Sequence, residues 1–279
     1  MARRLPGLPP YVTSVYRVGD VLVDSGCSSG RAAFARWLRR CEPRFVLTTH
    51  EHEDHIGNHA ILPAAAQVWA PALAARFLRE GHPRFPLYRR VVWGYHERAA
   101  HLAISLISRR QDAKAPREGD LASWRLGDER SVQPDKLDAG GRAFRVIPTD
   151  GHSVDHVAYL DERENALFSG DAYMGKFRAA RLEEDLHTEL ASLRRMAELD
   201  PATLYPVHGP VLPRPRARLL DTVEHFEALW RRAWPMRERG VPMRRIAREL
   251  LGGPAALTLI SGGEFSETKL IANLLRRGL

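Results

Sequence analysis

One short run constrains this chain more than any other feature: Thr-His-Glu-His-Glu-Asp-His at residues 49–55. Three histidines and an aspartate within six positions form a density of metal ligands that a soluble core does not produce by chance. His50 and His52 are two residues apart, so in an extended loop their imidazole rings point the same way. Asp54 and His55 follow at once and can turn toward a second ion. The run predicts a metal site, whereas a solvated charged patch would not require matching ligands elsewhere in the chain.

Matching ligands do occur elsewhere, and each follows a predicted strand. Just before the run, the apolar residues 45–48 indicate a buried strand. Ligands at the carboxyl end of such a strand lie where α/β folds place their active sites. Three later segments, 149–152, 168–171 and 205–209, end a strand with a histidine or an aspartate in the same way. Each sets a glycine beside its ligand, which permits a tight turn or a close approach.

The rest of the pattern alternates strands with helices. Two strands are predicted at 11–16 and 21–24, joined by a hairpin turn at Gly19-Asp20. Further strands are predicted at 67–70, 142–147, 157–160, 166–169 and 203–205, and helices at 31–40, 57–62, 182–197, 219–230, around 246–250, and from a Ser266 cap to about 277. This strand–helix–strand order favours α/β layers with parallel strand pairing.

Two regions depart from the alternation. Residues 71–125 contain segments compatible with helices, one of them at 95–108, and we interpret this region as a helical insertion that overhangs the metal site. Toward the C-terminus only helices are predicted. We therefore expect a catalytic domain over 1–212 and a small helical appendage over 213–279, with no internal repeat.

The composition limits the class of protein. Of the 279 residues 44% are hydrophobic and 27% are charged, as expected of a globular chain long enough to bury a core. No apolar run approaches the ~20 residues that a membrane span needs. The basic N-terminus has no apolar stretch behind it, so neither membrane insertion nor a secretory signal is expected. Two cysteines, Cys27 and Cys41, do not make a disulfide framework, which favours a cytoplasmic location.

The formal charge of +8 is unevenly distributed. From residue 210 to the C-terminus, thirteen Lys and Arg residues stand against seven Asp and Glu residues, which gives this part +6. Such a charge could attract an anionic substrate or a nucleic acid. Because most of these residues are arginines in predicted helices, a solvated helix face is the commoner explanation. RNA is therefore the less favoured partner.

The whole ligand pattern resembles the metallo-β-lactamase fold superfamily of metal-dependent hydrolases. The His-x-His-x-Asp-His signature at 50–55 is complete, and His152, Asp171 and His208 follow it in order, each near a glycine. The resemblance covers roughly residues 11–212. It implies an α/β fold, a four-layer αββα sandwich of two facing mixed sheets with the site at one edge.

Position by position, the resemblance assigns seven metal ligands. It places His50, His52 and His152 on the first metal, Asp54, His55 and His208 on the second, and Asp171 as a bridge between the two. Neutral imidazoles and carboxylates suit Zn²⁺, and Fe or Mn would also accept this set, so two Zn²⁺ ions per chain are expected. The bridging position favours an aspartate because an anion between two dications lowers their repulsion.

The resemblance also implies a mechanism. Two cations about 3.5–4 Å apart polarise an acyl or phosphoryl oxygen, and a metal-bound hydroxide attacks the substrate. Asp54 is the expected catalytic residue, since it could accept a proton or orient the hydroxide while it ligates. Asp24, where the family also keeps an aspartate, is expected to orient a ligand from behind. His59 and His156 are candidates for the same supporting role.

Within the superfamily the chain looks most like the glyoxalase II-like and β-lactamase-like-2 groups. The latter carries a winged-helix-like C-terminal module, which the 213–279 appendage would match. After its Gly-Asp, glyoxalase II has a glycine- and cysteine-rich segment that this chain lacks, so glutathione thioesters are disfavoured. Tyr173, Lys176 and Arg178 in that segment are expected to bind an anionic group beside the site.

Three functions stay open at this point. Hydrolysis of a thioester or ester of a small acyl compound is favoured. A metal-dependent phosphodiesterase or endoribonuclease is the alternative, supported by the basic tail but lacking the aromatic interleaving that stacks bases. An iron-dependent oxidoreductase or dioxygenase is disfavoured, because diiron reductases of this fold have Glu at the position of His52 and the dioxygenases leave the second site incomplete. The expected partner is a small molecule, which the charge allows to be anionic, and the tail could also form a homo-oligomer.

Overall fold

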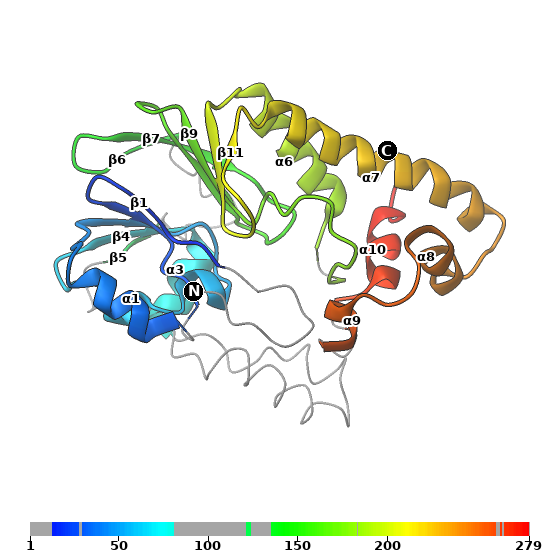
Figure 1. Cartoon of the computed structure of the whole chain (residues 1–279), viewed down its shortest axis with the longest axis horizontal. Coiled ribbons are helices and arrows are strands. Elements are labelled where there is room, and N and C mark those ends of the chain that lie inside the picture. The colour runs from blue at the N-terminus through cyan, green and yellow to red at the C-terminus, as the bar shows by residue number, and fades with distance from the viewer. Residues whose placement is uncertain are drawn as a thin grey trace.

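The computed structural model describes residues 13–27, 30–80, 121–123, 135–182, 184–260, 263 and 265–278. Within these residues the chain forms two β-sheets that face each other, with helices on both outer faces (Figure 1). This is the α/β sandwich with C-terminal helices that the sequence predicted.

The first sheet has the strand order β1-β2-β3-β4-β5. Its strands are β1 (Tyr16–Val18), β2 (Val21–Val23), β3 (Phe45–Leu47), β4 (Gln67–Ala70) and β5 (Leu121–Ser123). β1 and β2 form the predicted antiparallel hairpin, with Gly19 in the turn at a φ of 61°. The bounds predicted for the first strand, 11–16, are wrong, because residues 13–15 are not in a strand and β1 runs to Val18. β2, β3, β4 and β5 pair in parallel, as the alternation of strands and helices indicated.

Helices cross over between the parallel strands. α1 (Arg31–Leu38) links β2 to β3, and α3 (Ala72–Glu80) follows β4. Between β3 and β4, the helix predicted at 57–62 is wrong in its bounds. The chain forms α2 (Glu53–Ile56) and a single 3₁₀ turn, η2 (His59–Ile61), so that Asp54 and His55 lie on a helix rather than in the loop.

The second sheet has the order β11-β10-β9-β8-β7-β6. Its strands are β6 (Lys136–Asp138), β7 (Ala143–Pro148), β8 (Val157–Asp161), β9 (Ala166–Gly170), β10 (Thr203–Pro206) and β11 (Leu212–Pro213). β6 to β9 form an antiparallel meander, and β10 pairs in parallel with β9. β7, β9 and β10 therefore run in the same direction and end at the same edge of the sheet.

Strand alternation divides the core into layers. Val21 and Val23 face the second sheet, where they pack with residues such as Phe144 and Phe168. Leu22, between them in sequence, points the other way and packs against α1. Successive side chains of a strand point to opposite faces, so one short strand contributes to two layers of the core.

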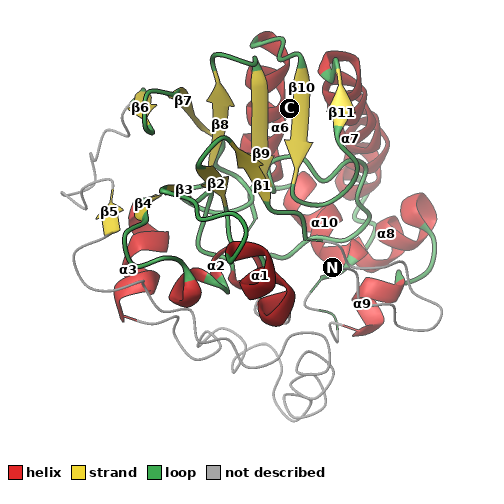
Figure 2. Cartoon of the chain, turned by 60° about the vertical axis from the view of Figure 1, so that its left-hand side comes forward, coloured by secondary structure: helices red, strands yellow, loops and turns green. Residues whose placement is uncertain are grey.

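The C-terminal half supplies further helices, and the first two of them cover the outer face of the second sheet. These helices are α6 (Leu186–Glu198), α7 (Arg216–Glu238), α8 (Met243–Leu251), α9 (Ala256–Ile260) and α10 (Glu267–Leu274). Figure 2 shows α6 and α7 behind β8 to β11. α6 begins at Leu186 and not at Leu182, because Asp185 caps it by accepting a hydrogen bond from the Thr188 amide. Ser266 caps α10 as predicted.

One hydrophobic cluster runs from the second sheet to the C-terminus. It joins the outer face of the sheet to α6 and continues through α7, α8 and α10, with Leu160, Leu190, Phe226, Ile246 and Ile271 among its buried members. The boundary at residue 213 stays a prediction about domains. In the packing, the helices beyond it share a core with the sheet.

The proposed insertion at 71–125 lies mostly outside the described residues, and the helix expected at 95–108 is among the parts left out. The two described ends of this region belong to the first sheet and the helices that pack on it. β5 pairs with β4, and α3 packs Ala74 and Leu78 against Ile56. None of the helices in the described part of the chain is long and apolar enough to cross a membrane.

Candidate metal centre

Four chain segments bring the predicted ligands together at the edge where β7, β9 and β10 end. The loop after β3 carries His50 and leads through His52 into α2. His152, Asp171 and His208 follow β7, β9 and β10 respectively. Because β7, β9 and β10 run in the same direction, the three ligands that follow them lie at one edge of the second sheet, and the loop after β3 of the first sheet brings the others to the same place.

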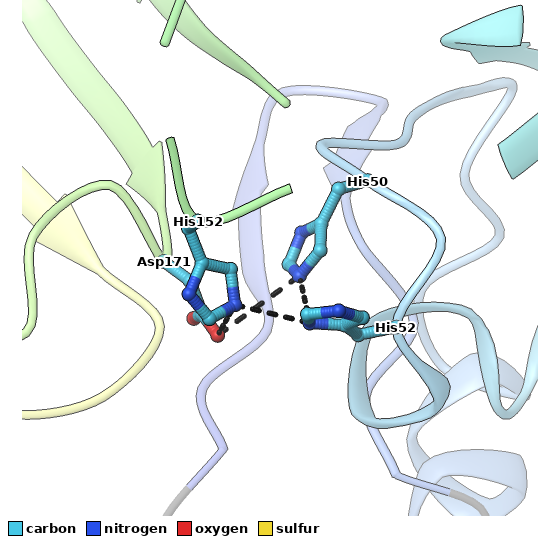
Figure 3. Close-up of side chains that lie close together, drawn as sticks. All are labelled: His50, His52, His152 and Asp171. Carbon is cyan, nitrogen blue, oxygen red and sulfur yellow. Dashed lines mark hydrogen bonds and ion pairs between the residues drawn. The ribbon is translucent and has the colours of Figure 1, made fainter. Parts of the chain in front are cut away.

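The first group of ligands contains three histidines and one carboxylate oxygen (Figure 3). His52 Nδ1 lies 2.8 Å from His50 Nε2 and 3.0 Å from His152 Nε2. Asp171 Oδ2 lies 3.3 Å from His152 Nε2 and 4.0 Å from His50 Nε2. One donor atom from each residue thus faces a common point, as a four-ligand metal site requires.

The second group is built in the same way around the other oxygen of Asp171. Asp171 Oδ1 lies 3.2 Å from His55 Nε2 and 3.4 Å from His208 Nε2. Asp54 Oδ2 lies 3.3 Å from His208 Nε2 and 3.9 Å from His55 Nε2. In each of the two groups, all four donor atoms lie within 4.8 Å of one another.

These donor atoms fit metal ions better than they fit each other. His55 Nε2 and Asp171 Oδ1 are buried, and neither makes a hydrogen bond within the described part of the chain, although they lie 3.2 Å apart. A buried polar atom without a partner is costly, and a cation would satisfy both atoms at once. The set of five imidazoles and two carboxylates therefore fits divalent ions, and Asp171 contributes one oxygen to each ligand group.

The electrostatics differ between the two ligand groups. In the first group, burial lowers the pKa of His50, and its histidine neighbours lower it further, so this imidazole stays neutral. Burial works to raise the pKa of Asp171, but His208 and His55 hold it well below its ordinary value. Neutral imidazoles and ionised carboxylates are the forms that bind metal ions. In the second group, burial tends to lower the pKa values of His55 and His208, but Asp171 and its neighbouring carboxylates raise the pKa of His55 well above its ordinary value and that of His208 to about 11, so an ion binding there would displace protons.

Asp24 lies behind the second group, where the sequence placed it. Its Oδ2 accepts a hydrogen bond from His55 Nδ1 at 2.8 Å and from the Thr49 hydroxyl at 2.9 Å, and its Oδ1 accepts from the Thr49 amide at 2.8 Å. Because His55 Nδ1 carries the hydrogen, its Nε2 lone pair points at the metal group. Asp24 itself is buried and has a φ of 57°, an uncommon conformation for a residue with a side chain.

His156 and His59 have supporting contacts and do not join the ligand groups. His156 Nε2 accepts a hydrogen bond from the Asp171 amide at 3.0 Å, which fixes the backbone of that residue. The approach is so close that a Cβ on Gly170, which has a φ of 52°, would lie 2.7 Å from His156 Nε2. His59 is held on the other side of the loop, between Ser25 at 2.7 Å and Thr48 at 2.9 Å.

The sequence missed two charged residues at the first group. Arg181 Nη2 lies 3.0 Å from His52 Nε2, and Glu184 Oε1 lies 3.7 Å from His152 Nδ1. Both side chains are largely buried, and Arg181 Nε donates to Glu184 Oε1 at 3.2 Å. They precede α6 in a segment without a recognisable ligand motif, so no sequence signal marked them.

The three predicted substrate-binding residues have other contacts. Tyr173 is buried in the core beneath α7, and Lys176 forms an exposed ion pair with Asp221 at 2.9 Å. Arg178 donates to the carbonyl oxygens of Leu251 and Gly253, at the end of α8. These contacts give no support to the expectation that the three residues bind an anionic group.

Comparisons with known proteins agree with this geometry. A profile of the family described as the metallo-beta-lactamase superfamily matches residues 8–208. The lactamase-like protein adaB of Aspergillus niger is 36% identical over 114 residues, which cover 41% of this chain and 35% of that protein. A beta-lactamase-like protein 2 homolog of Caenorhabditis elegans is 35% identical over 85 residues, 30% of this chain and 28% of that protein. The matched part thus spans about a third of the first relative and less than a third of the second.

A solved structure covers nearly the whole chain. The crystal structure of a metallo-beta-lactamase family protein from Thermus thermophilus superposes with a TM-score of 0.59, covering 97% of this chain and 88% of that one. The sequence identity is 22%, so this likeness concerns the fold.

Proposed function

Since this chain belongs to the metallo-beta-lactamase superfamily, we propose that it is a dinuclear metal-dependent hydrolase acting on a thioester or ester of a small acyl compound. The observation that carries the proposal is the division of Asp171 between the two ligand groups. One oxygen faces His50 and His152, and the other faces His55 and His208. A single carboxylate placed in this way serves two cations and lowers their repulsion.

Different residues of the chain would have different roles in hydrolysis. When bound, two divalent ions, which we expect to be Zn²⁺, would supply Lewis-acid polarisation of the scissile carbonyl and activation of a water. The seven ligands would hold the ions, and Asp24 and His156 would fix the directions of His55 and Asp171. The buried positions of these supporting residues keep the ligand geometry rigid.

Asp54 is the residue that we propose to orient the attacking water. Its side chain is about a fifth exposed, whereas Asp171 is buried, so Asp54 lies on the open side of the second group. Burial tends to raise its pKa, but His55 and His208 hold the pKa well below its ordinary value. Asp54 is therefore ionised at neutral pH and can orient an attacking water by accepting a hydrogen bond from it, although so low a pKa makes it a weak base.

A serine nucleophile has less support in the described residues. Ser25 Oγ lies 2.7 Å from His59 Nδ1, which is the type of contact that activates a serine. Both residues are fully buried, however, and burial lowers the pKa of His59 to about 3. An imidazole with such a pKa is a weak base, and the hydroxyl is out of reach of a substrate.

The phosphodiesterase alternative loses part of its basis. It rests on the basic tail, where several arginines have partners within the protein. Arg237 donates to the Leu275 carbonyl, Arg276 donates to the Glu184 carbonyl at 3.0 Å, and Arg231 pairs with Glu224. Charges used in this way are less available to phosphates.

Cys27 and Cys41 form no disulfide, which supports the proposed cytoplasmic location.

The proposal is tested by an activity screen on the metal-loaded protein. Thioester, ester, phosphodiester and lactam substrates are compared before and after removal of metal by a chelator. We expect hydrolysis of small acyl thioesters or esters that the chelator abolishes and added Zn²⁺ restores. Chelator-resistant hydrolysis would contradict the metal-dependent mechanism. Cleavage of phosphodiesters alone would reject the acyl substrate in favour of the alternative.

A further inference from the structure

A guanidinium stands where a ligating histidine usually has an acceptor. Arg181 Nη2 lies 3.0 Å from His52 Nε2, while the other ring nitrogen, Nδ1, belongs to the first ligand group. The Arg181 side chain is only 11% exposed, so water does little to screen this contact. The pKa of His52 is lowered, first by burial and then by the Arg181 charge.

The hydrogen bond between Arg181 and His52 is incompatible with metal binding by His52 Nδ1. A neutral imidazole that binds a metal through Nδ1 carries its hydrogen on Nε2, which normally donates to a carboxylate, carbonyl or water. The guanidinium of Arg181 has only N–H donors and cannot accept. An ion on His52 Nδ1 would therefore place one donor against another, 3.0 Å apart, with a fixed positive charge nearby.

Two other ligands show the usual arrangement. His55 Nδ1 donates to the Asp24 carboxylate at 2.8 Å. His50 Nδ1 lies 3.0 Å from the Thr49 hydroxyl, which passes its own hydrogen to Asp24 and can therefore accept. Both imidazoles thus have an acceptor behind them, and His52 has a cation in that place.

Arg181 is held firmly in this position. Its Nε donates to Glu184 Oε1 and its amide to Glu184 Oε2, both at 3.2 Å. Its guanidinium lies 5.5 Å from the centre of the Phe265 ring, and its carbonyl accepts from Asn273 of α10 at 3.4 Å. Turning the guanidinium away from His52 would disturb the Glu184 and Phe265 contacts.

We propose that Arg181 weakens metal binding at the first group, so that the two ions bind in sequence. The second group, made of Asp54, His55, His208 and one oxygen of Asp171, fills first. The first group fills only when Arg181 turns away from His52. Arg181 is a positioning residue in this account, and the inference rests on the proposed dinuclear centre.

The experiment measures Zn²⁺ affinity by competition with a chromophoric chelator in two backgrounds. The Asp54→Ala/His208→Ala background disables the second group, and the His50→Ala/His152→Ala background disables the first. In each, Arg181 is compared with Arg181→Gln, whose amide oxygen can accept from His52 Nε2. In the Asp54→Ala/His208→Ala background, where the first group is intact, we expect the substitution to tighten Zn²⁺ binding about 10- to 100-fold. This is the size of effect that outer hydrogen-bond partners have on metal sites. We expect no change in the second background.

Two matched variants control for charge and for packing. Arg181→Lys keeps a charged donor and should leave the affinity of the first group low. Arg195→Gln removes an exposed guanidinium on α6 that donates to the Pro148 carbonyl, and it should change neither affinity. Because Arg181→Gln leaves the buried Glu184 without its ion-pair partner, Arg181→Gln/Glu184→Gln is measured as well, with the same expected gain.

The outcomes separate this inference from the proposed function. The role of Arg181 is overturned if the affinity of the first group is unchanged in both Arg181→Gln and Arg181→Gln/Glu184→Gln. It is also overturned if the gain in affinity is equal in the two backgrounds. Equal affinities of the two groups in the unmodified chain also overturn it. A chain that binds fewer than two ions at saturating Zn²⁺ contradicts the proposed dinuclear function instead.

Discussion

Asp24 shows how one buried carboxylate sets the direction of a proposed metal ligand. It accepts from His55 Nδ1 and holds the Thr49 loop, while its own backbone has a φ of 57°. Asparagine tolerates this conformation but has no negative charge. We therefore expect Asp24→Asn to weaken Zn²⁺ binding at the second group by about 10- to 100-fold with the fold retained. Chelator competition measures the loss, and the exposed Asp221→Asn serves as control. Equal affinities in the two variants would argue against this role.

Asp155 gives the stability of the protein a pH dependence. It accepts a hydrogen bond from the Leu73 amide at 2.6 Å, while its Oδ1 is buried without a partner among the described residues. Burial and then the nearby Glu51 raise the pKa of Asp155 to about 7. A carboxyl whose pKa is raised by folding favours the native state while protonated. This contribution is present below about pH 4 and is lost as the pH rises to 7.

Asp155→Asn removes this ionisation while an amide oxygen can still accept from Leu73. Relative to the unmodified chain, the free energy of unfolding of the variant should be higher by about 1–3 kcal/mol at pH 8 and little changed near pH 4. This range lies below the free energy that corresponds to the full pKa shift, because the residue is partly exposed. Urea unfolding at the two pH values measures the difference in the free energy of unfolding. A gain that is the same at both would show that Asp155 does not titrate in this range.

At the scale of elements, α10 fixes the segment between β9 and α6 that faces the first ligand group. Asn273 is fully buried and donates to the carbonyls of Arg181 and Glu184, and its Oδ1 accepts from the Leu186 amide at 3.2 Å. Asn273→Ala would remove this partner from the Leu186 amide and the Arg181 carbonyl, and would leave the Glu184 carbonyl with Arg276 alone. We expect a loss of about 1–3 kcal/mol in the free energy of unfolding.

The control for Asn273→Ala is Ser266→Ala, at the N-cap of the same helix. Losing this cap costs about 1 kcal/mol without touching the 181–186 segment. Both variants are compared by urea unfolding and by Zn²⁺ affinity. Only Asn273→Ala should alter metal binding at the first group. If both variants alter it equally, general loosening of α10 explains the result, and not the contacts of Asn273.

Some element boundaries could not be predicted, because distant side chains decide them. Asn58 donates to the carbonyls of Ser25 at 2.9 Å and Cys27 at 3.0 Å, between α2 and η2 where one helix was predicted. Leu182 fits the helical spacing of α6, yet it is 52% exposed and its carbonyl accepts from Arg276. Periodicity reports which face of a segment is apolar and not which long-range hydrogen bonds end a helix.

At the scale of the molecule, the helices beyond residue 213 complete the core of the second sheet. Leu190 and Met196 of α6 are buried in the same cluster as Leu219 and Phe226 of α7. A chain ending at residue 212 would expose this apolar face of α6. We expect such a truncation to aggregate or to lose cooperative thermal unfolding, as followed by circular dichroism. A soluble 1–212 fragment with a single sharp transition would show that the two parts fold independently.

The sequence was most informative where spacing and chemistry coincide. The ligands His50 to His55 and Asp171 could be predicted, because strand ends and ligand types are both visible in the sequence and parallel strands end at one edge. Arg181 and Glu184 could not, since they reach the centre only through the contacts of α10. The shared core of α6 and α7 was hidden for a related reason. The apolar face of a helix does not indicate which other element packs against it.

The central claim is that Asp171 lets one chain hold two metal ions, and the most direct test is the number of ions bound. The protein is saturated with Zn²⁺ and desalted, and zinc per chain is measured by elemental analysis beside Asp171→Ala, with folding checked by circular dichroism. We predict close to two ions for the unmodified chain and fewer for the variant, in which both groups lose a ligand. One ion or none in the folded, unmodified chain, or two ions in Asp171→Ala, would contradict the account.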